Sequence, residues 1–346
     1  MAIRNPVEQR DNESKKVTGV GELRLPIEFL GELEVFLGKQ IDEFEAEIRN
    51  LARYAVQNSG RRLRPSLLYF TGVDEEGRYS GDLVSAAAVV ELVHIATLVH
   101  DDILDKAELR RRQPTVFHKE GAPIAVLLGD ALFAHALRLA SEYETTLVCR
   151  EVAHATRAVC AGETRQVHLR GDLNLEIGEY LRIIELKTAE LFRVSCLLGS
   201  LVRDGEDLAS AQALASFGKH LGRAYQIYDD AADFVGREES LGKTLGTDLA
   251  TGKLTLPALL LRDHLGVEAF QELFSEMQAG DAERGREVLS AKMEQTEVFP
   301  ELVEYFTREL QAARTGLARA NVPDLSRQSL EQLLVFLEGE FNGLVV

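Results

Sequence analysis

The sequence predicts an all-α fold, and two observations lead to that prediction. From about Leu30 onward, apolar residues recur at the three- and four-residue spacing of a helix face, while the alternating, β-branched runs typical of strands are scarce. Seven of the eight prolines lie between these periodic segments or at their starts, where a missing N–H is tolerated. Because 45% of the 346 residues are hydrophobic, the chain can bury a large core. We therefore expect a helical bundle.

The periodic segments give the expected helices in chain order. They cover 28–57, 65–72, 82–106, 122–142, 147–171, 176–203, 207–237, 255–275, 281–294, 298–320 and 324–342. Segments 82–106 and 186–202 are apolar on nearly every face, which predicts central helices surrounded by others. No internal repeat and no Ser/Pro-rich linker divides the chain. We therefore expect a polar tail over 1–25 and a single all-helical domain over 26–346.

The net charge of −17 argues against nucleic-acid binding, which relies on a basic face to displace counterions from phosphates. If the substrate is itself anionic, local arginine clusters and bound divalent cations must reverse the potential at the site.

Targeting signals are weak in this sequence. The first 24 residues are polar and lack the apolar core of a signal peptide. The longest apolar stretch, 84–99, contains Glu91 and His94 and is shorter than the roughly 20 residues that cross a bilayer, so we expect no membrane span. Three cysteines without CxxC spacing lie in apolar helical patterns, which favours buried, reduced thiols in a cytoplasmic protein: Cys149, Cys160 and Cys196.

Two aspartate-rich motifs are the sharpest features of the sequence. Asp101 and Asp105 follow an apolar helix and share one face, so their carboxylates repel unless a cation lies between them. The pattern recurs as Asp229-Asp230-Ala231-Ala232-Asp233 after another apolar helix. Paired carboxylates suit Mg²⁺, which prefers oxygen ligands and is commonly completed by substrate phosphates, whereas zinc would require a Cys/His cluster. Solvated acidic helix ends are the alternative, and the repetition of the motif counts against it.

Two runs of arginine accompany these carboxylates. Arg61, Arg62 and Arg64 lie on a turn that starts with glycine, and Arg110-Arg111-Arg112 follows the first acidic motif. Arginine forks bind phosphate through two hydrogen bonds at once. Either run alone would suit a solvated surface or an ion pair. Beside carboxylates that would repel an anionic substrate, phosphate binding is the better interpretation.

Taken together, these residues resemble the trans-isoprenyl diphosphate synthase, or polyprenyl synthetase, family. Its members carry a GGKRxRP-like turn, a first DDxxD motif followed by RR, a KT pair and an FQxxDD-type second motif. The match runs from about Arg61 to Pro257 in the same order. The resemblance implies an all-α isoprenoid synthase bundle with a central cavity, a homodimer, and about three Mg²⁺ ions per active site, mostly bridged to substrate.

The resemblance also implies roles for individual residues. The metal ligands are expected to be Asp101, Asp102, Asp105, Asp229, Asp230 and Asp233. Arg110 is similar to the family's allylic-diphosphate arginine, while the isopentenyl diphosphate site is expected to contain Arg61, Arg64, His94 and Arg111.

Three further residues match positions that line the ionising allylic group: Lys187, Thr188 and Gln226. Lys243 and Lys253 lie in a loop that resembles the family's cationic flap. Outside this resemblance, Lys187 could simply pair with a nearby glutamate, Gln226 could be a buried amide, and His94 could be a core histidine.

Some positions depart from the family pattern. Arg61 stands where lysine is usual, which keeps the charge but changes its reach. Ser59 replaces a glycine, Arg112 stands where glycine is frequent, and Tyr225 stands where phenylalanine is common. None of these changes removes an expected metal ligand.

The residues before the first motif bear on product length. Ala96 and Thr97 lie five and four residues before Asp101, about 6–7.5 Å down the helix, and we expect them on its motif-bearing side beneath the metal site. Small residues here resemble the long-chain branch of the family. The alternatives are a short-chain geranylgeranyl or farnesyl diphosphate synthase, or ordinary packing of small residues.

The implied reaction is ionisation of an allylic prenyl diphosphate, attack by the double bond of isopentenyl diphosphate, and loss of a proton. A lipid product would also bring the enzyme into contact with a membrane surface. A class I terpene cyclase usually has a different second motif and lacks the isopentenyl diphosphate arginines. A regulatory subunit of a heteromeric synthase would be expected to lose motif aspartates, and here both motifs are intact.

Overall fold

The fold was analysed in a computed structural model of the chain. The structure describes residues 25–58, 60, 62–205, 207–235, 251–279 and 282–345, and for 276–279 and 282–287 it describes the backbone alone. All of the expected tail over 1–25 except Leu25 lies outside these ranges, as do Ser59, Arg61 and Lys243.

Helices make up most of the described chain, as the sequence predicts. They are α1 (Ile27–Asp42), α2 (Ala46–Gln57), α3 (Leu63–Gly72), α4 (Gly81–Leu104), α5 (Val116–Glu120), α6 (Ala122–Ser141), α7 (Leu147–His168), α8 (Ile177–Ile184), the π-helix η2 (Glu185–Ala189), α9 (Glu190–Arg203), α10 (Leu208–Val235), α13 (Leu256–Leu265), α14 (Val267–Ala279), α15 (Ala282–Glu294), α16 (Val298–Arg319) and α17 (Asp324–Val345). A two-stranded hairpin joins β1 (Leu109–Arg110) to β2 (Gln113–Pro114).

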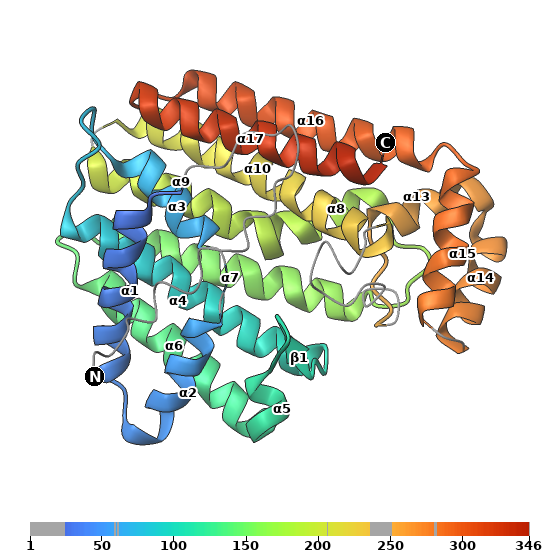
Figure 1. Ribbon diagram of the computed structural model, residues 1–346, viewed down its shortest axis with the longest axis horizontal. Helices are drawn as coiled ribbons and strands as arrows, with labels where there is room; N and C mark the ends of the chain where they lie inside the picture. Colours follow the sequence, from blue (N-terminus) through green and yellow to red (C-terminus); the bar gives the residue numbers. More distant parts are fainter. Residues whose placement is uncertain are drawn as a thin grey trace, which may run out of the picture.

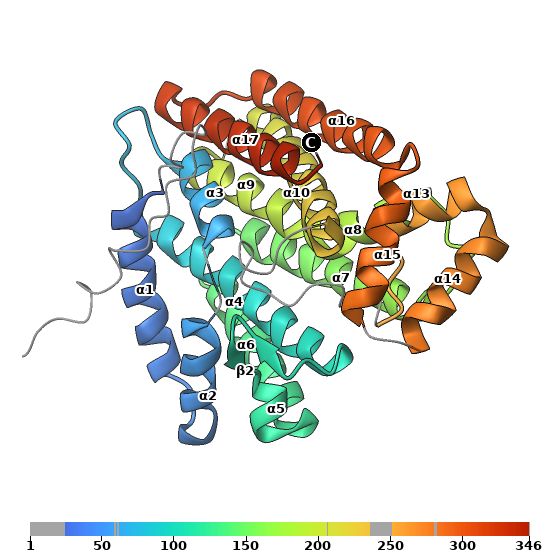
Figure 2. The same cartoon turned by 45° about the vertical axis from the view of Figure 1, so that its right-hand side comes forward.

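The helices surround a central group formed by α4, α7, α9 and α10 (Figures 1 and 2). Helices α16 and α17 cover α10, α1 and α6 lie along α4, and α13, α14 and α15 close one end. Two hydrophobic clusters meet at α9: Leu198 belongs to the cluster that includes buried residues of α1, α4 and α6, whereas Phe192 belongs to the cluster that includes α10, α13 and α16. The apolar segments 82–106 and 186–202 are therefore central, as their composition predicts.

Two of the expected helices are each broken in two. The segment 28–57 is interrupted after Asp42, where Phe44 turns into the core and stacks on the ring of His135 at 4.6 Å between centroids. The segment 255–275 is interrupted at Gly266, whose φ of +83° ends α13 in a conformation that suits glycine. The first break depends on a distant partner, so local periodicity could not predict it.

Cys160 departs from its expected environment. Among the three cysteines, all free, Cys196 is buried, Cys149 is half-buried and Cys160 is exposed. The prediction of a buried thiol is therefore wrong for Cys160, because the apolar face of α7 is carried by neighbours such as Val159 and Ala155.

Among the described residues, two helices are long and apolar enough to cross a membrane by length and composition, α4 and α6. In α4, 72% of the apolar window is buried by the surrounding helices. In α6 the corresponding share is 44%, so this helix keeps an uncovered apolar face.

Candidate active site

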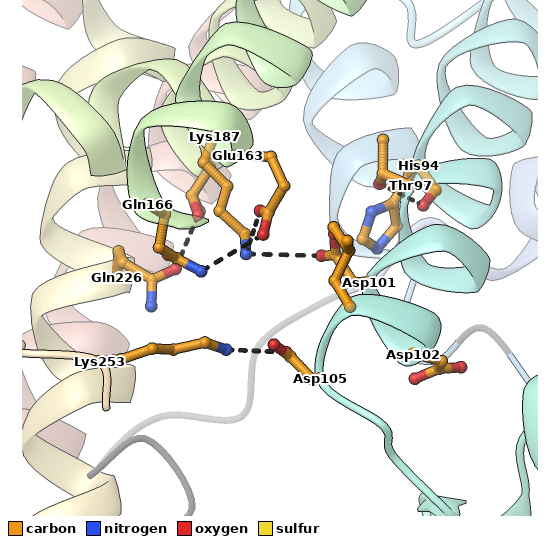
Figure 3. A network of polar contacts seen from close by, with 12 residues as sticks. His94, Thr97, Asp101, Asp102, Asp105, Glu163, Gln166, Lys187, Gln226 and Lys253 are labelled. Atoms are coloured by element: carbon orange, nitrogen blue, oxygen red, sulfur yellow. Dashed lines mark hydrogen bonds and ion pairs between the residues drawn. The ribbon is translucent and has the colours of Figure 1, made fainter. Parts of the chain in front are cut away.

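The first aspartate motif ends α4 and faces the π-helix. Asp101 and Asp105 lie on the same side of α4, directed toward Lys187 and Lys253, while Asp102 turns away (Figure 3). The Nζ of Lys187 lies 3.7 Å from Asp101 Oδ2 and also forms an ion pair with Glu163 of α7. Lys187 thus lies between two carboxylates from different helices.

Burial disfavours the charge of Asp101. Desolvation raises the pKa of Asp101 to about 6; Lys187 opposes this shift, and Glu163 and Asp105 add to it. Asp105 behaves differently. Burial raises its pKa, but Lys253, Lys187 and Arg170 outweigh this effect and hold the pKa of Asp105 below its ordinary value.

Asp102 contacts an arginine instead of facing Asp101. Arg110 Nε on β1 donates to Asp102 Oδ1 at 2.9 Å, and Asp102 is buried. Adjacent residues on a helix lie about 100° apart, so Asp102 cannot share the face of Asp101 and Asp105. The structure therefore places Asp102 where it orients Arg110.

The second motif lies on α10, the helix that also carries Gln226. Asp229 is half-buried on α10, while Asp230 and Asp233 are buried. Asp230 Oδ1 accepts from Gln226 Nε2 at 2.7 Å and Asp230 Oδ2 accepts from the hydroxyl of Tyr180 at 2.5 Å. Both oxygens of Asp230 are therefore engaged within the protein.

The π-helix η2 presents the Lys-Thr pair to both motifs. Lys187 reaches Asp101, and the hydroxyl of Thr188 donates to Gln226 Oε1 at 2.8 Å. Gln226 in turn donates to Asp230, so a chain of hydrogen bonds links η2 to the second motif. The widened turn of a π-helix is frequent at functional sites.

A second cationic group lies beside the first motif. Arg64 Nη1 donates to His94 Nε2 at 3.0 Å, so this nitrogen of the ring must be the acceptor. Burial, and then the charge of Arg64, Arg110, Arg111 and Arg62, holds the pKa of His94 well below its ordinary value. His94 is therefore neutral, bonded to Arg64 and close to the positive charge of neighbouring arginines.

The arginines of the two basic runs separate into different environments. Arg62 is buried and pairs with Glu34 at 2.7 Å and Glu91 at 2.6 Å, so it joins α1 to α4 instead of facing the site. Arg111 and Arg112 form the turn between β1 and β2 with φ of +51° and +61°. Such a turn favours glycine, which explains why glycine is frequent at position 112; Arg112 adopts the same left-handed conformation with a side chain. The guanidinium of Arg111 occupies the space where a side chain on Gly60 would lie.

The two expected chain-length residues diverge. Thr97 is half-buried on the side of α4 that carries Asp101, four residues later. Ala96 is completely buried, and His100, four residues further on, contacts the carbonyl of Val126 in α6. Five residues turn a helix about 140°, so Ala96 is rotated away from Asp101 around α4 whereas Thr97 shares its side. The chain-length role of both residues stays a prediction.

The donor set of the first motif fits Mg²⁺. Within the described ranges, no three His, Cys, Asp or Glu side chains lie close enough to form a complete cage for a metal. Mg²⁺ does not need one, because it keeps several waters and takes phosphate oxygens from its substrate. Asp101 is buried beside Asp105, and the charges of the two carboxylates are opposed by lysine and arginine cations. A divalent cation would stabilise this pair of carboxylates.

Three residues of this site were not predicted from the sequence: Glu163, Arg170 and Tyr180. Each reaches its partner from a helix or loop distant in sequence, so no local spacing identifies it. A glycine next to Glu163 and another next to Arg170 are the only local signals.

Comparison with known proteins identifies the family of the chain. A family model described as polyprenyl synthetase matches residues 45–291. The chain belongs to the polyprenyl synthetase family. It is 36% identical over 236 residues to component 2 of heptaprenyl diphosphate synthase from Bacillus subtilis (strain 168), covering 65% of this chain and 67% of that protein. It is also 36% identical over 215 residues to geranylgeranyl diphosphate synthase from Methanosarcina mazei, covering 61% and 66% respectively.

The fold of this chain is also similar to those of solved structures of the family. The crystal structure of a polyprenyl synthase from Caulobacter crescentus CB15, complexed with calcium and isoprenyl diphosphate, superposes with a TM-score of 0.80 and 31% sequence identity, covering 90% of this chain and 94% of that one. The all-α isoprenoid synthase fold and the assignment to the prenyltransferases follow from these similarities.

Proposed function

We propose that this polyprenyl synthetase family member joins isopentenyl diphosphate head-to-tail to an allylic prenyl diphosphate in a Mg²⁺-dependent trans condensation. The observation that carries the proposal is the pair of facing polar groups: Asp101 and Asp105 on α4 oppose Lys187 and the Thr188–Gln226 pair from η2 and α10. The Caulobacter relative binds calcium and isoprenyl diphosphate, which supports a divalent cation and a diphosphate in this position.

In this proposal, Asp101, Asp105 and Asp229 hold Mg²⁺, which neutralises the diphosphate as it leaves the allylic carbon. Lys187 and Lys253, which pair with Asp101 and Asp105, contribute positive charge beside that leaving group. The cluster around His94, with Arg64 and Arg111, binds the diphosphate of the second substrate. Arg110, oriented by Asp102, has a charge that acts on both Asp101 and His94. No side-chain nucleophile is required.

We further propose a long-chain product. Thr97, four residues below Asp101 on the same face of α4, leaves room for a growing chain that a bulky side chain would block. The named relatives include heptaprenyl and geranylgeranyl diphosphate synthases, so product length is open to measurement. A geranylgeranyl or farnesyl product would replace the long-chain proposal while leaving the reaction unchanged.

One experiment tests the function. The chain is incubated with isopentenyl diphosphate and an allylic primer, with Mg²⁺ or with a chelator, and the products are identified by mass. We expect condensation only with Mg²⁺, and turnover at least ~100-fold lower for Asp101→Ala and Asp229→Ala, a loss of about 3 kcal/mol of transition-state stabilisation. Turnover near that of the wild type in either variant would contradict the two-motif metal site.

A further inference from the structure

Asp105 is held by two cations from segments far apart in the sequence. Arg170, just after α7, donates through Nη2 to Asp105 Oδ1 at 2.5 Å. Lys253, just before α13, donates through Nζ to Asp105 Oδ2 at 2.7 Å. Each oxygen of the carboxylate therefore has its own cation.

The two segments that carry these cations are joined to each other. The backbone N–H of Gly171 donates to the carbonyl of Gly252 at 2.8 Å, so the residue after Arg170 is bonded to the residue before Lys253. Gly252 has φ of +77°, a conformation that suits glycine, and it lies close to the backbone of Gly171. This crossing holds both cations on the same carboxylate.

The two cations are not equivalent. Arg170 also donates through Nη1 to the carbonyl of Leu104, the last residue of α4, at 3.1 Å. Its rigid fork therefore spans the carboxylate and the end of the helix that carries it, which fixes the orientation of Asp105. Lys253 contacts Asp105 through a single ammonium on a flexible stem, so it can leave without disturbing that orientation.

We propose that Arg170 is a positioning residue for the metal site: it holds Oδ1 of Asp105 and thereby presents Oδ2, the oxygen that Lys253 occupies, to the incoming cation. Groups that hydrogen-bond to a metal-binding side chain commonly orient it in this way. Lys253, displaced from Asp105 when the metal binds, becomes available to the diphosphate. This inference rests on the proposed function, because it takes Asp105 to be a metal ligand.

The proposal predicts that removing Arg170 and removing Lys253 change the affinity for the metal in opposite directions. If both simply compete with the metal for Asp105, removing either one should tighten metal binding, because a positive charge is lost from the site. If Arg170 orients the carboxylate, its removal should weaken binding despite the lost charge, while removal of Lys253 should tighten it.

Binding of Mn²⁺ alone, measured by the paramagnetic resonance of the free ion at neutral pH, separates these cases. Arg170→Met should raise the dissociation constant about 10- to 100-fold. Lys253→Met should lower it. The matched control is Arg165→Met, which removes an arginine of α7 whose ion pair with Glu179 lies outside the site. This control should bind Mn²⁺ as the wild type does. A melting curve for each variant shows that it is folded.

Each result has a defined consequence. Equal or tighter binding by Arg170→Met, or equal weakening by Arg165→Met, would overturn the positioning role. Weaker binding by Lys253→Met would overturn the exchange. If the wild type takes up no Mn²⁺ even with inorganic pyrophosphate, the proposed function itself fails, whereas normal uptake by the wild type confines any failure to this inference.

Discussion

At the scale of single residues, Asp101 combines a buried carboxylate with a pKa of about 6, well above the roughly 3.9 of an aspartate in an unfolded chain. Because the folded state binds this proton more tightly, the stability it contributes is complete below about pH 4 and is lost as the pH rises through about 6. A metal ion bound to Asp101 would offset the cost of burying its ionised carboxylate at neutral pH. Below the pKa of Asp101, the metal must compete with the proton.

We therefore expect metal binding to depend on pH. The dissociation constant for Mn²⁺ should fall as the pH rises from about 5 to 7 and then level off, because Asp101 is ionised above its pKa. Asp101→Asn should bind more weakly and lose most of this dependence. Titrations of Mn²⁺ at several pH values check both statements. An unchanged pH dependence in Asp101→Asn would assign the proton to another group.

Arg64 and His94 form a second pair whose states are linked. Because the pKa of His94 is held well below its ordinary value, the ring remains neutral and accepts from Arg64, leaving the guanidinium to carry the charge. Arg64→Ala or His94→Ala should raise the Michaelis constant for isopentenyl diphosphate more than that for the allylic primer. Steady-state kinetics with each substrate varied in turn decide this. Equal effects on both constants would show that the cluster does not distinguish the substrates.

At the scale of elements, the sequence predicts where most helices lie but not how their turns are shaped. Leucine and alanine periodicity places α4, α7 and α10, and the four-residue spacing of Asp101 and Asp105 places both on one face. The π-helix η2 has no local signal. It lies where Gly162 of α7 and Gly222 of α10 approach its backbone, so its shape depends on contacts between distant segments.

These two glycines should therefore control how the Lys-Thr pair is presented. A side chain on Gly162 would lie 2.7 Å from the backbone nitrogen of Lys187, and one on Gly222 would lie 2.6 Å from Cα of Ala189. Gly162→Ala should lower kcat, because the π-helix must shift and carry Lys187 with it, and should cost about 1–3 kcal/mol of stability. The Michaelis constant for isopentenyl diphosphate should change little, because the His94 cluster lies on other helices.

Gly38, in the middle of α1, is the matched control. Nothing lies within 4 Å of a side chain built there, so Gly38→Ala should leave kcat unchanged and stabilise the fold by about 0.5–1 kcal/mol. Kinetics and thermal unfolding of the three proteins are compared at a temperature where all are folded. A wild-type kcat in Gly162→Ala would show that the π-helix does not depend on this contact.

At the scale of the whole molecule, the sequence predicts the two aspartate motifs and the arginine runs because each is local. It does not predict which carboxylate oxygens are engaged by other side chains of the protein. Asp230 is engaged by Tyr180 and Gln226, and Asp102 by Arg110, through contacts that only the packed bundle creates. Arg62 carries the same charge as its neighbours in sequence, yet it is directed into an ion pair with Glu91, because its backbone turns at φ of +53° before α3.

The uncovered face of α6 bears on the proposed homodimer. Four large apolar side chains of this one helix are exposed: Ile124, Val126, Leu127 and Leu137. Leu127 is 59% exposed, while the opposite side of α6 packs on α4 through buried residues such as Leu128. Large apolar side chains exposed together on one helix are typical of an interaction surface, and a second copy of the same helix would bury them symmetrically.

Sedimentation of the wild type should therefore give a dimer, and Leu127→Glu should shift it toward monomer, because the substitution places a charge in the centre of the apolar contact. Val335→Glu is the matched control, since Val335 of α17 is similarly exposed, at 54%, on a helix that covers the other side of the bundle. It should remain a dimer. If both variants sediment as the wild type does, α6 is not the dimer interface. Loss of vesicle binding by Leu127→Glu without a change in sedimentation would instead show that this face contacts a membrane surface, as release of a lipid product would require.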